Sequence, residues 1–242
     1  MVAEVCNLHL PIGHTVGDIE YYINKLQGID GKILEVACGT GRVIVPLLKA
    51  GFDIEGLDYC PGMLEVCKKN CQERKLDPIL HHHNMINFKK LEYYSAILIP
   101  AGSIRNIDGY DDTRSALKSF YNSLKPDGLL LVDLIAPRFI IALGPMQYWE
   151  KDPYLWTTEL LRQDYDPLAN RTFNFVRYQK WQDGELLKTE LHRSCLQHWG
   201  LDEFAQLLTK VGFTDINIIA DFKENSKPKS GSADWTFIAK KP

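Results

Sequence analysis

Apolar and polar residues follow two different periods along the first half of the chain. Helical spacing appears first at residues 16–27, where Val16, Ile19, Tyr22, Ile23 and Leu26 fall on one face. Short, nearly continuous apolar runs, such as residues 94–99, are typical of strands buried on both faces of a parallel sheet. The pattern predicts helices at residues 16–27, 42–50, 63–74 and 112–124, and strands at 32–37, 52–58, 79–83, 94–99 and 129–134.

The pattern changes in the second half of the chain. Residues 172–181 alternate between apolar and polar side chains, Asp183-Gly184 is a turn signal, and residues 186–198 return as a partner strand. A helix at 201–211 and strands at 216–222 and 235–239 complete the chain. We expect residues 145–198 to be an inserted antiparallel β subregion, serving as a substrate lid or a dimer face.

Strands that alternate with helices through short connections predict an α/β fold with a doubly wound, mostly parallel sheet. The length of 242 residues suits a single domain that spans residues 1–242. The first predicted helix, residues 15–27, precedes the first strand and is expected to lie over the ligand cleft. Ligands of such sheets bind beyond the carboxyl ends of the strands, where the strand order reverses.

The first predicted strand runs directly into the sequence Glu35-Val36-Ala37-Cys38-Gly39-Thr40-Gly41. A strand, a glycine turn and a helix N-terminus form a pocket for the polar groups of a ligand. Asp58 ends the next strand, about 20 residues later, where a carboxylate can bind the hydroxyls of a ribose. The pattern therefore predicts a site for a nucleoside cofactor.

Two cofactor classes compete for this site. Dinucleotide enzymes need a third small residue after the two glycines, but Ile44 occupies that position, and Glu35 has no role there. The phrase E-x-A-C-G-T-G resembles motif I of the class I S-adenosylmethionine-dependent methyltransferases of small molecules. The later run Lys-Pro-Asp-Gly-Leu-Leu-Leu-Val-Asp, the Val211-Gly212-Phe213 phrase and the closing hairpin match that family in order.

The resemblance implies a seven-stranded sheet with a reversed final strand. It also implies that S-adenosyl-L-methionine is the cofactor and S-adenosyl-L-homocysteine the product. The glycine turn would hold the methionine part, Asp58 the ribose, and Tyr59 with Met63 the adenine. Asn84-Met85 stand where the family often has an acidic and an apolar residue. The cofactor-binding residues implied by the resemblance are Glu35, Ala37, Cys38, Gly39, Gly41, Asp58, Tyr59, Met63, Asn84, Met85, Pro100 and Ala101.

The resemblance implies methyl transfer to the N or O of a small molecule. Methylation of amines in nucleic-acid bases is disfavoured, because the D/N-P-P-Y/F/W motif of such enzymes is missing after residue 99. A protein or structured RNA as the acceptor, and a non-catalytic S-adenosylmethionine-binding module, remain alternatives. A general base, if the reaction uses one, could come from several positions, none of which the sequence singles out: His9, His14, Arg105, His192 and His198.

Composition excludes several partners. A net charge of −3 gives no general attraction to the backbone of DNA. The longest apolar runs, such as residues 129–136, are too short to span a bilayer. The first residues show no leader pattern, so we expect a cytoplasmic protein that acts on a small molecule away from membranes. A homodimer is an open possibility.

Six cysteines do not form a disulfide framework, because none of them makes a C-x-x-C pair and several fall in the predicted cofactor fold. Cys67 and Cys71, with the histidines at 81–83 nearby, suggest a metal site. The alternative, an ordinary amphipathic helix beside a strand whose histidines alternate between faces, explains them better. We therefore expect no metal.

Overall fold

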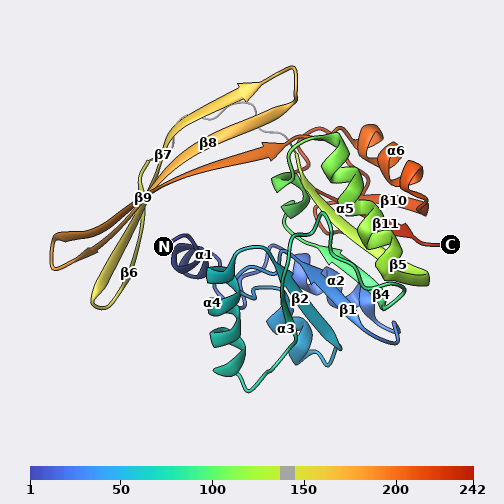
Figure 1. Cartoon of the computed structure of the whole chain (residues 1–242), viewed down its shortest axis with the longest axis horizontal. Helices are drawn as coiled ribbons and strands as arrows, with labels where there is room; N and C mark the ends of the chain where they lie inside the picture. The colour runs from blue at the N-terminus through green and yellow to red at the C-terminus, as the bar shows by residue number, and fades with distance from the viewer. Residues whose placement is uncertain (137–144) are drawn as a thin grey trace.

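The computed structural model describes residues 1–136 and 145–242. A seven-stranded sheet with helices on both faces forms the core, and a separate four-stranded antiparallel sheet, the auxiliary sheet, projects from it (Figure 1). No helix within these ranges combines the length and apolar character needed to cross a membrane.

The central sheet confirms the predicted fold class. Its strands, in spatial order, are β10 (Thr214–Ala220), β11 (Asp234–Lys240), β5 (Leu124–Ile135), β4 (Tyr94–Ile99), β1 (Ile33–Val36), β2 (Ile54–Asp58) and β3 (Leu80–His82). The five strands from β5 to β3 are paired in parallel, whereas β11 runs antiparallel to both β5 and β10. The strand order reverses between β1 and β4, so a ligand cleft is expected at their carboxyl ends.

Helices cover each face of this sheet and explain the apolar runs. One face is covered by α2 (Asp18–Leu26), α3 (Ile44–Lys49) and α4 (Pro61–Gln72), and the other by α5 (Tyr110–Ser123) and α6 (Leu201–Val211). Successive side chains of β4 alternate between the two apolar layers: Ala96 and Leu98 pack in the first, and Ile97 and Ile99 in the second. A strand buried on both sides has no polar face, which is why the sequence of β4 is apolar at every position except Ser95.

The auxiliary sheet is a meander of β6 (Gln147–Lys151), β7 (Tyr154–Asp166), β8 (Arg171–Gln182) and β9 (Glu185–Gln197). Its base is attached to the core beside the short 3-10 helix η1 (Ser103–Asn106), which follows β4. There the buried Arg105 donates to the carbonyl of Gln197 (3.3 Å) and lies 3.2 Å from Nδ1 of His198.

The sequence did not predict the N-terminal helix, α1 (Val2–His9). Only Val5 of this helix is buried, so its apolar pattern is weak. Contacts from distant parts of the chain hold it in place: Glu4 pairs with Lys180 at 3.0 Å, and Asn7 accepts from Asn70 at 2.7 Å. These partners lie on β8 and α4, and such contacts leave no trace in local periodicity.

Two predicted boundaries need correction. β5 begins at Leu124 and not at 129, because Leu124 pairs with Tyr94 and Leu129 with Ala96, so residues 125–128 form a bulge inside the strand. α4 begins at Pro61 and not at Met63, since proline is well suited to the first helical position, where no backbone donor is needed.

Candidate functional site

A cavity of about 520 Å³ lies at the carboxyl ends of β1, β2 and β4, beside the point where the strand order reverses. It brings together most of the residues that the sequence proposed. Those in its lining are Glu35, Ala37, Cys38, Gly39, Asp58, Tyr59, Met63, Met85, Pro100 and Ala101. Gly41 and Asn84 are not part of this lining.

The turn after β1 has an unusual backbone that opens it toward the cavity. Ala37 and Gly39 both have a φ of 55°, in the left-handed region, and Gly41 has a φ of 98°. A Cβ on Gly39 would come no nearer to other atoms than 4.0 Å, whereas a Cβ on Gly41 would lie 3.0 Å from Sγ of Cys67. Gly39 therefore keeps the cavity floor open, and Gly41 lets the turn pack against α4.

Glu35 carries a buried carboxylate whose hydrogen bonds are incomplete. The residue is 2% exposed, and its Oε2 atom has no hydrogen-bond partner among the described residues. Burial raises the pKa of the Glu35 carboxyl well above its usual range, against the attraction of Arg42. An unpartnered buried carboxylate oxygen is unfavourable. A ligand that carries an ammonium or N–H group into the cavity would complete it.

Asp58 lines the same cavity, and both of its carboxylate oxygens have hydrogen-bond partners. Its Oδ2 accepts the backbone N–H of Gly39 at 2.9 Å, and its Oδ1 accepts that of Cys60 at 2.8 Å. The carboxylate thus links the turn after β1 to the start of α4. Each oxygen keeps a free acceptor position, so the group suits a pair of neighbouring hydroxyls.

One wall of the cavity is formed by Tyr59, by two methionines and by the loop after β3. Tyr59 is 69% exposed and its ring lies 6.5 Å from that of His82. Met63 on α4 and Met85 after β3 add apolar surface suited to a planar ring. Asn84 accepts the backbone N–H of Ile86 at 2.9 Å, so its side chain shapes the loop that carries Met85.

The loop after β4 is fixed by a buried residue that sequence reasoning missed. Ala101 has a φ of 54°, and its N–H donates to Oδ2 of Asp133 on β5 at 3.0 Å. The same oxygen accepts the hydroxyl of Tyr22 on α2, and Oδ1 accepts that of Thr236 at 2.8 Å. Burial raises the pKa of Asp133 to about 7, despite these three donors. An aspartate inside an apolar strand was the signal that could have identified it.

Arg42 ties the N-terminal region to the glycine turn. It lines the cavity, lies 2.6 Å from Oδ2 of the buried Asp18 at the start of α2, and donates to the carbonyl of His14 at 3.2 Å. Sequence reasoning missed this role, although Arg42 directly follows the turn. The remaining lining residues that it missed are Cys6, Leu10, Thr40, Val43, Cys60, Ser103 and Asn106.

The structure separates the candidate bases. His192, on β9, lines the cavity. His9 packs edge-on against Trp149 at 5.5 Å, and His198 lies between Arg105 and the Thr172 hydroxyl, which is 2.6 Å from its Nε2. Neither these two histidines nor His14 is part of the cavity lining.

The residues that suggested a metal site have other partners. Cys38, Cys67 and Cys71 are buried next to one another beneath the glycine turn, and hydrogen bonding within this row raises the pKa of the Cys67 and Cys71 thiols. His81 lies 2.7 Å from Oε2 of Glu55. Across the residues that the structure describes, no group of three or more His, Cys, Asp or Glu side chains could hold a metal ion.

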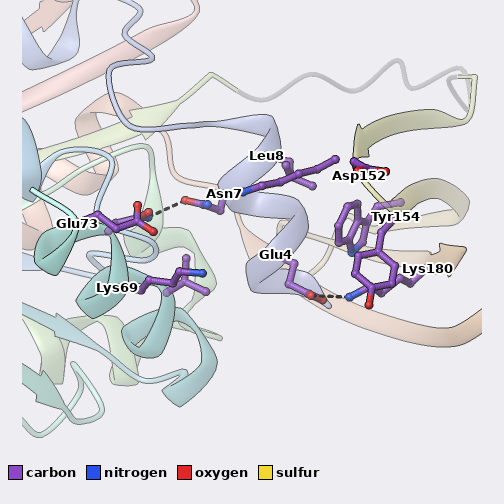
Figure 2. Close-up of a pocket in the computed structure, with 12 residues that line it drawn as sticks. Glu4, Asn7, Leu8, Lys69, Glu73, Asp152, Tyr154 and Lys180 are labelled. Carbon is purple, nitrogen blue, oxygen red and sulfur yellow. Dashed lines mark hydrogen bonds and ion pairs between the residues drawn. The ribbon is translucent and has the colours of Figure 1, made fainter. Parts of the chain in front are cut away.

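Helix α1 separates the cavity from a second one of about 330 Å³. Cys6 and Leu10 line the first cavity, while Glu4, Asn7 and Leu8, on the opposite side of the helix, line the second. Figure 2 shows α1 between Lys69 and Glu73 of α4 on one side and Tyr154 and Lys180 of the auxiliary sheet on the other. Asn70 connects the linings of the two cavities. Its amide donates to Asn7, which lines the second cavity, and to the carbonyl of Thr40, which lines the first, at 2.8 Å.

Comparisons with known proteins agree with this architecture. A family model described as a methyltransferase domain matches residues 33–128. A protein of Geobacillus sp. (strain WCH70) named as a methyltransferase is 29% identical over 87% of this chain and 84% of its own length. The dTDP-3-amino-3,6-dideoxy-alpha-D-glucopyranose N,N-dimethyltransferase of Streptomyces fradiae is 32% identical over 48% of this chain and 44% of its own.

A solved structure shares the whole fold. The S-adenosylmethionine-dependent methyltransferase from Clostridium acetobutylicum ATCC 824 superposes with a TM-score of 0.80 over 99% of this chain and 97% of its own, at 16% identity. The family model covers the part of the chain that carries β1, the glycine turn and Asp58. Together these findings show that the chain carries a methyltransferase domain and has the fold of a class I S-adenosylmethionine-dependent methyltransferase.

Proposed function

We propose that the cavity beside the strand reversal binds S-adenosyl-L-methionine and that the enzyme methylates an amine nitrogen of a small molecule, releasing S-adenosyl-L-homocysteine. The observation that carries the proposal is the unpartnered Oε2 of Glu35, a buried acceptor on a residue that lines the cavity. The methionine part of the cofactor carries an ammonium group of the kind that this oxygen lacks.

The other lining residues match the remaining parts of the cofactor. Asp58 would bind the ribose hydroxyls, and the backbone around Ala37, Cys38 and Gly39 the methionine carboxylate. Tyr59, Met63 and Met85 would enclose the adenine, and Pro100 with Ala101 would lie beneath the sulfur. Gly41 and Asn84 would act indirectly, by shaping the turn and the loop.

The cofactor supplies a methyl group that is already activated by its positive sulfur. The protein therefore has to orient the acceptor and exclude water. The fixed loop at Ala101 and the half-satisfied carboxylate of Glu35 suit this task, since both are held rigid by buried contacts. Preorganised groups of this kind need no rearrangement when the reaction occurs.

An amine in a small molecule is the favoured acceptor for two reasons. The relative from Streptomyces fradiae is named for N,N-dimethylation of an amino sugar nucleotide. The cavity is also partly closed by α1 and the auxiliary sheet, through Cys6, Leu10 and His192, which leaves limited space beside the cofactor groups. We propose that residues 145–198 form the acceptor side of the site. Pairing of two chains through the same sheet is a separate possibility that sedimentation analysis would reveal.

Calorimetry with S-adenosylhomocysteine tests the proposal directly. Wild-type protein should bind one molecule per chain, and Asp58→Ala should weaken binding more than tenfold, since it removes charge-assisted contacts worth roughly 1.5–3 kcal/mol. Asp53→Ala is the matched control, because Asp53 is exposed and its carboxylate pairs with Lys32 at 2.9 Å. Lack of binding by the wild type, or unchanged affinity of Asp58→Ala, would refute the assignment.

Turnover over a panel of small amines and alcohols separates an enzyme acting on metabolites from the alternatives. We expect methylation of at least one amine, with an amino sugar nucleotide as the first compound to test. A protein that binds the cofactor but methylates nothing in the panel would contradict the proposed acceptor class.

We also propose a cytoplasmic location, which is supported by six free cysteines, since reducing compartments keep thiols unpaired.

A further inference from the structure

The acceptor side of the cavity contains one side chain that can take up a proton near neutral pH. His192 is exposed on β9 and contributes to the cavity lining. Ser103 and Asn106, on η1 against β9, are polar side chains of the same lining. Neither an alcohol nor an amide side chain is a proton acceptor at this pH, whereas an imidazole is.

We propose that His192 is the general base that deprotonates the acceptor amine, a proposal that rests on the function proposed above. A protonated amine has no free electron pair and cannot form a bond to the methyl carbon. The imidazole takes one proton from the R–NH3⁺ group, which leaves R–NH2 with a lone pair and a protonated His192. Because the His192 side chain reaches solvent, the proton then passes to water and the neutral imidazole is restored.

The surroundings of His192 fit this role. Tyr178 on β8 contacts its ring edge-on at 6.4 Å, and Cys6 reaches the cavity from α1. Burial raises the pKa of both the Tyr178 hydroxyl and the Cys6 thiol, so both stay neutral near pH 7. Glu190, two residues earlier on the same face of β9, is paired with Lys188 at 2.7 Å and with the N-terminal amine at 3.5 Å. The other charged or ionisable groups that line the cavity are Glu35, Cys38, Arg42, Asp58, Tyr59 and Cys60.

NMR of the histidine rings tests whether His192 lies near the bound cofactor, and it needs no methyl acceptor. The peaks are assigned by comparison with His192→Gln and His9→Gln. S-adenosylmethionine carries a positive charge that S-adenosylhomocysteine lacks, and a nearby positive charge disfavours a protonated imidazole. We expect the pH midpoint of the His192 signal to be lower by about 0.4 pH unit or more with the charged ligand, as for a unit charge roughly 8 Å away in water. His9, which packs on Trp149 outside the cavity lining, is the internal control and should not respond.

Two results of this experiment would contradict the proposals, and each points to a different one. If both ligands bind by calorimetry and the His192 midpoint is the same with each, the base assignment is wrong and the cofactor site stands. If neither ligand binds, the proposed cofactor site itself is overturned, and the role of His192 with it.

The role in proton transfer is tested with the amine that the wild type methylates best. His192→Gln should lower kcat about 100-fold near pH 7, within the range typical of a lost general base. The deficit should shrink as the pH approaches the titration range of the amine, where the substrate is already neutral. Leu191→Ala, an exposed neighbour on the opposite face of β9, should behave as wild type. A deficit in His192→Gln that is equal at every pH would indicate a structural role and overturn the proposal.

Discussion

The two carboxylates of the cavity differ in how far the protein itself satisfies them. Asp58 receives a backbone N–H on each oxygen, whereas Glu35 keeps one oxygen without a partner among the described residues. Asp58 therefore supports the turn, and we propose that its remaining acceptor positions bind the ligand. We propose that Glu35 is a binding group that the fold tolerates at a loss of stability, because ionising this buried carboxyl is unfavourable until a ligand completes its contacts.

Glu35→Gln should separate these two effects. The amide keeps the shape of the side chain and removes the charge, so the free energy of unfolding of the cofactor-free protein should rise by about 1 kcal/mol. The affinity for S-adenosylmethionine should fall about tenfold or more, because a charge-assisted contact is lost. Chemical denaturation and calorimetry measure the two changes. A variant that is less stable than wild type and binds the cofactor normally would show that Glu35 has a structural role only.

At the level of secondary-structure elements, Asp133 is the residue that joins the parts of the site. It sits on β5 and accepts hydrogen bonds from α2, from the loop after β4 and from β11, through Tyr22, Ala101 and Thr236. The loop at Ala101 has a left-handed backbone that needs such support. One buried carboxyl therefore sets the position of the loop beneath the proposed cofactor relative to the helix before β1.

Asp133→Asn should change how stability depends on pH. The pKa of Asp133 is raised to about 7, above its value in an unfolded chain, which is about 3.9. The unfolded chain thus loses its proton first, and this carboxyl lowers the free energy of unfolding as the pH rises from about 4 to about 7, by at most about 1.4 kcal/mol per pH unit. The asparagine does not titrate, so the decline over this window should become shallower. Denaturation midpoints at a series of pH values measure it.

The control for this experiment is Asp127→Asn, since Asp127 is an exposed aspartate paired with Lys240 at 2.7 Å. It should retain the wild-type slope. The asparagine at 133 cannot serve all three donors equally, so an overall loss of about 1–3 kcal/mol should accompany the change in slope. An unchanged slope in Asp133→Asn would mean that this carboxyl is ionised throughout the window.

At the scale of the whole molecule, the parts that could be predicted are those fixed by local sequence. The inner strands of the central sheet were recognisable because burial on both faces favours apolar residues, and the glycine turn because its backbone favours glycine at 39 and 41. Asp58 followed from its place at the end of β2. These features depend on neighbours in the chain.

The parts that escaped prediction depend on contacts between distant segments. Helix α1 is held by Lys180 and Asn70, and His192 reaches the cavity only because the auxiliary sheet is attached beside η1. That Gly41 contacts the cofactor stays a prediction, and its Cβ position faces Cys67 of α4. Which of two glycines faces a ligand and which faces a helix is decided by the packing of the turn, and the spacing of the glycines does not contain that information.

A crystal structure of the protein with S-adenosylhomocysteine would show whether the cavity at the strand reversal is the cofactor site. We expect electron density along the carboxyl ends of β1 and β2, with the amino group within hydrogen-bonding distance of Oε2 of Glu35 and both ribose hydroxyls on Asp58. Density in the second cavity behind α1, with Glu35 still unpartnered, would contradict it.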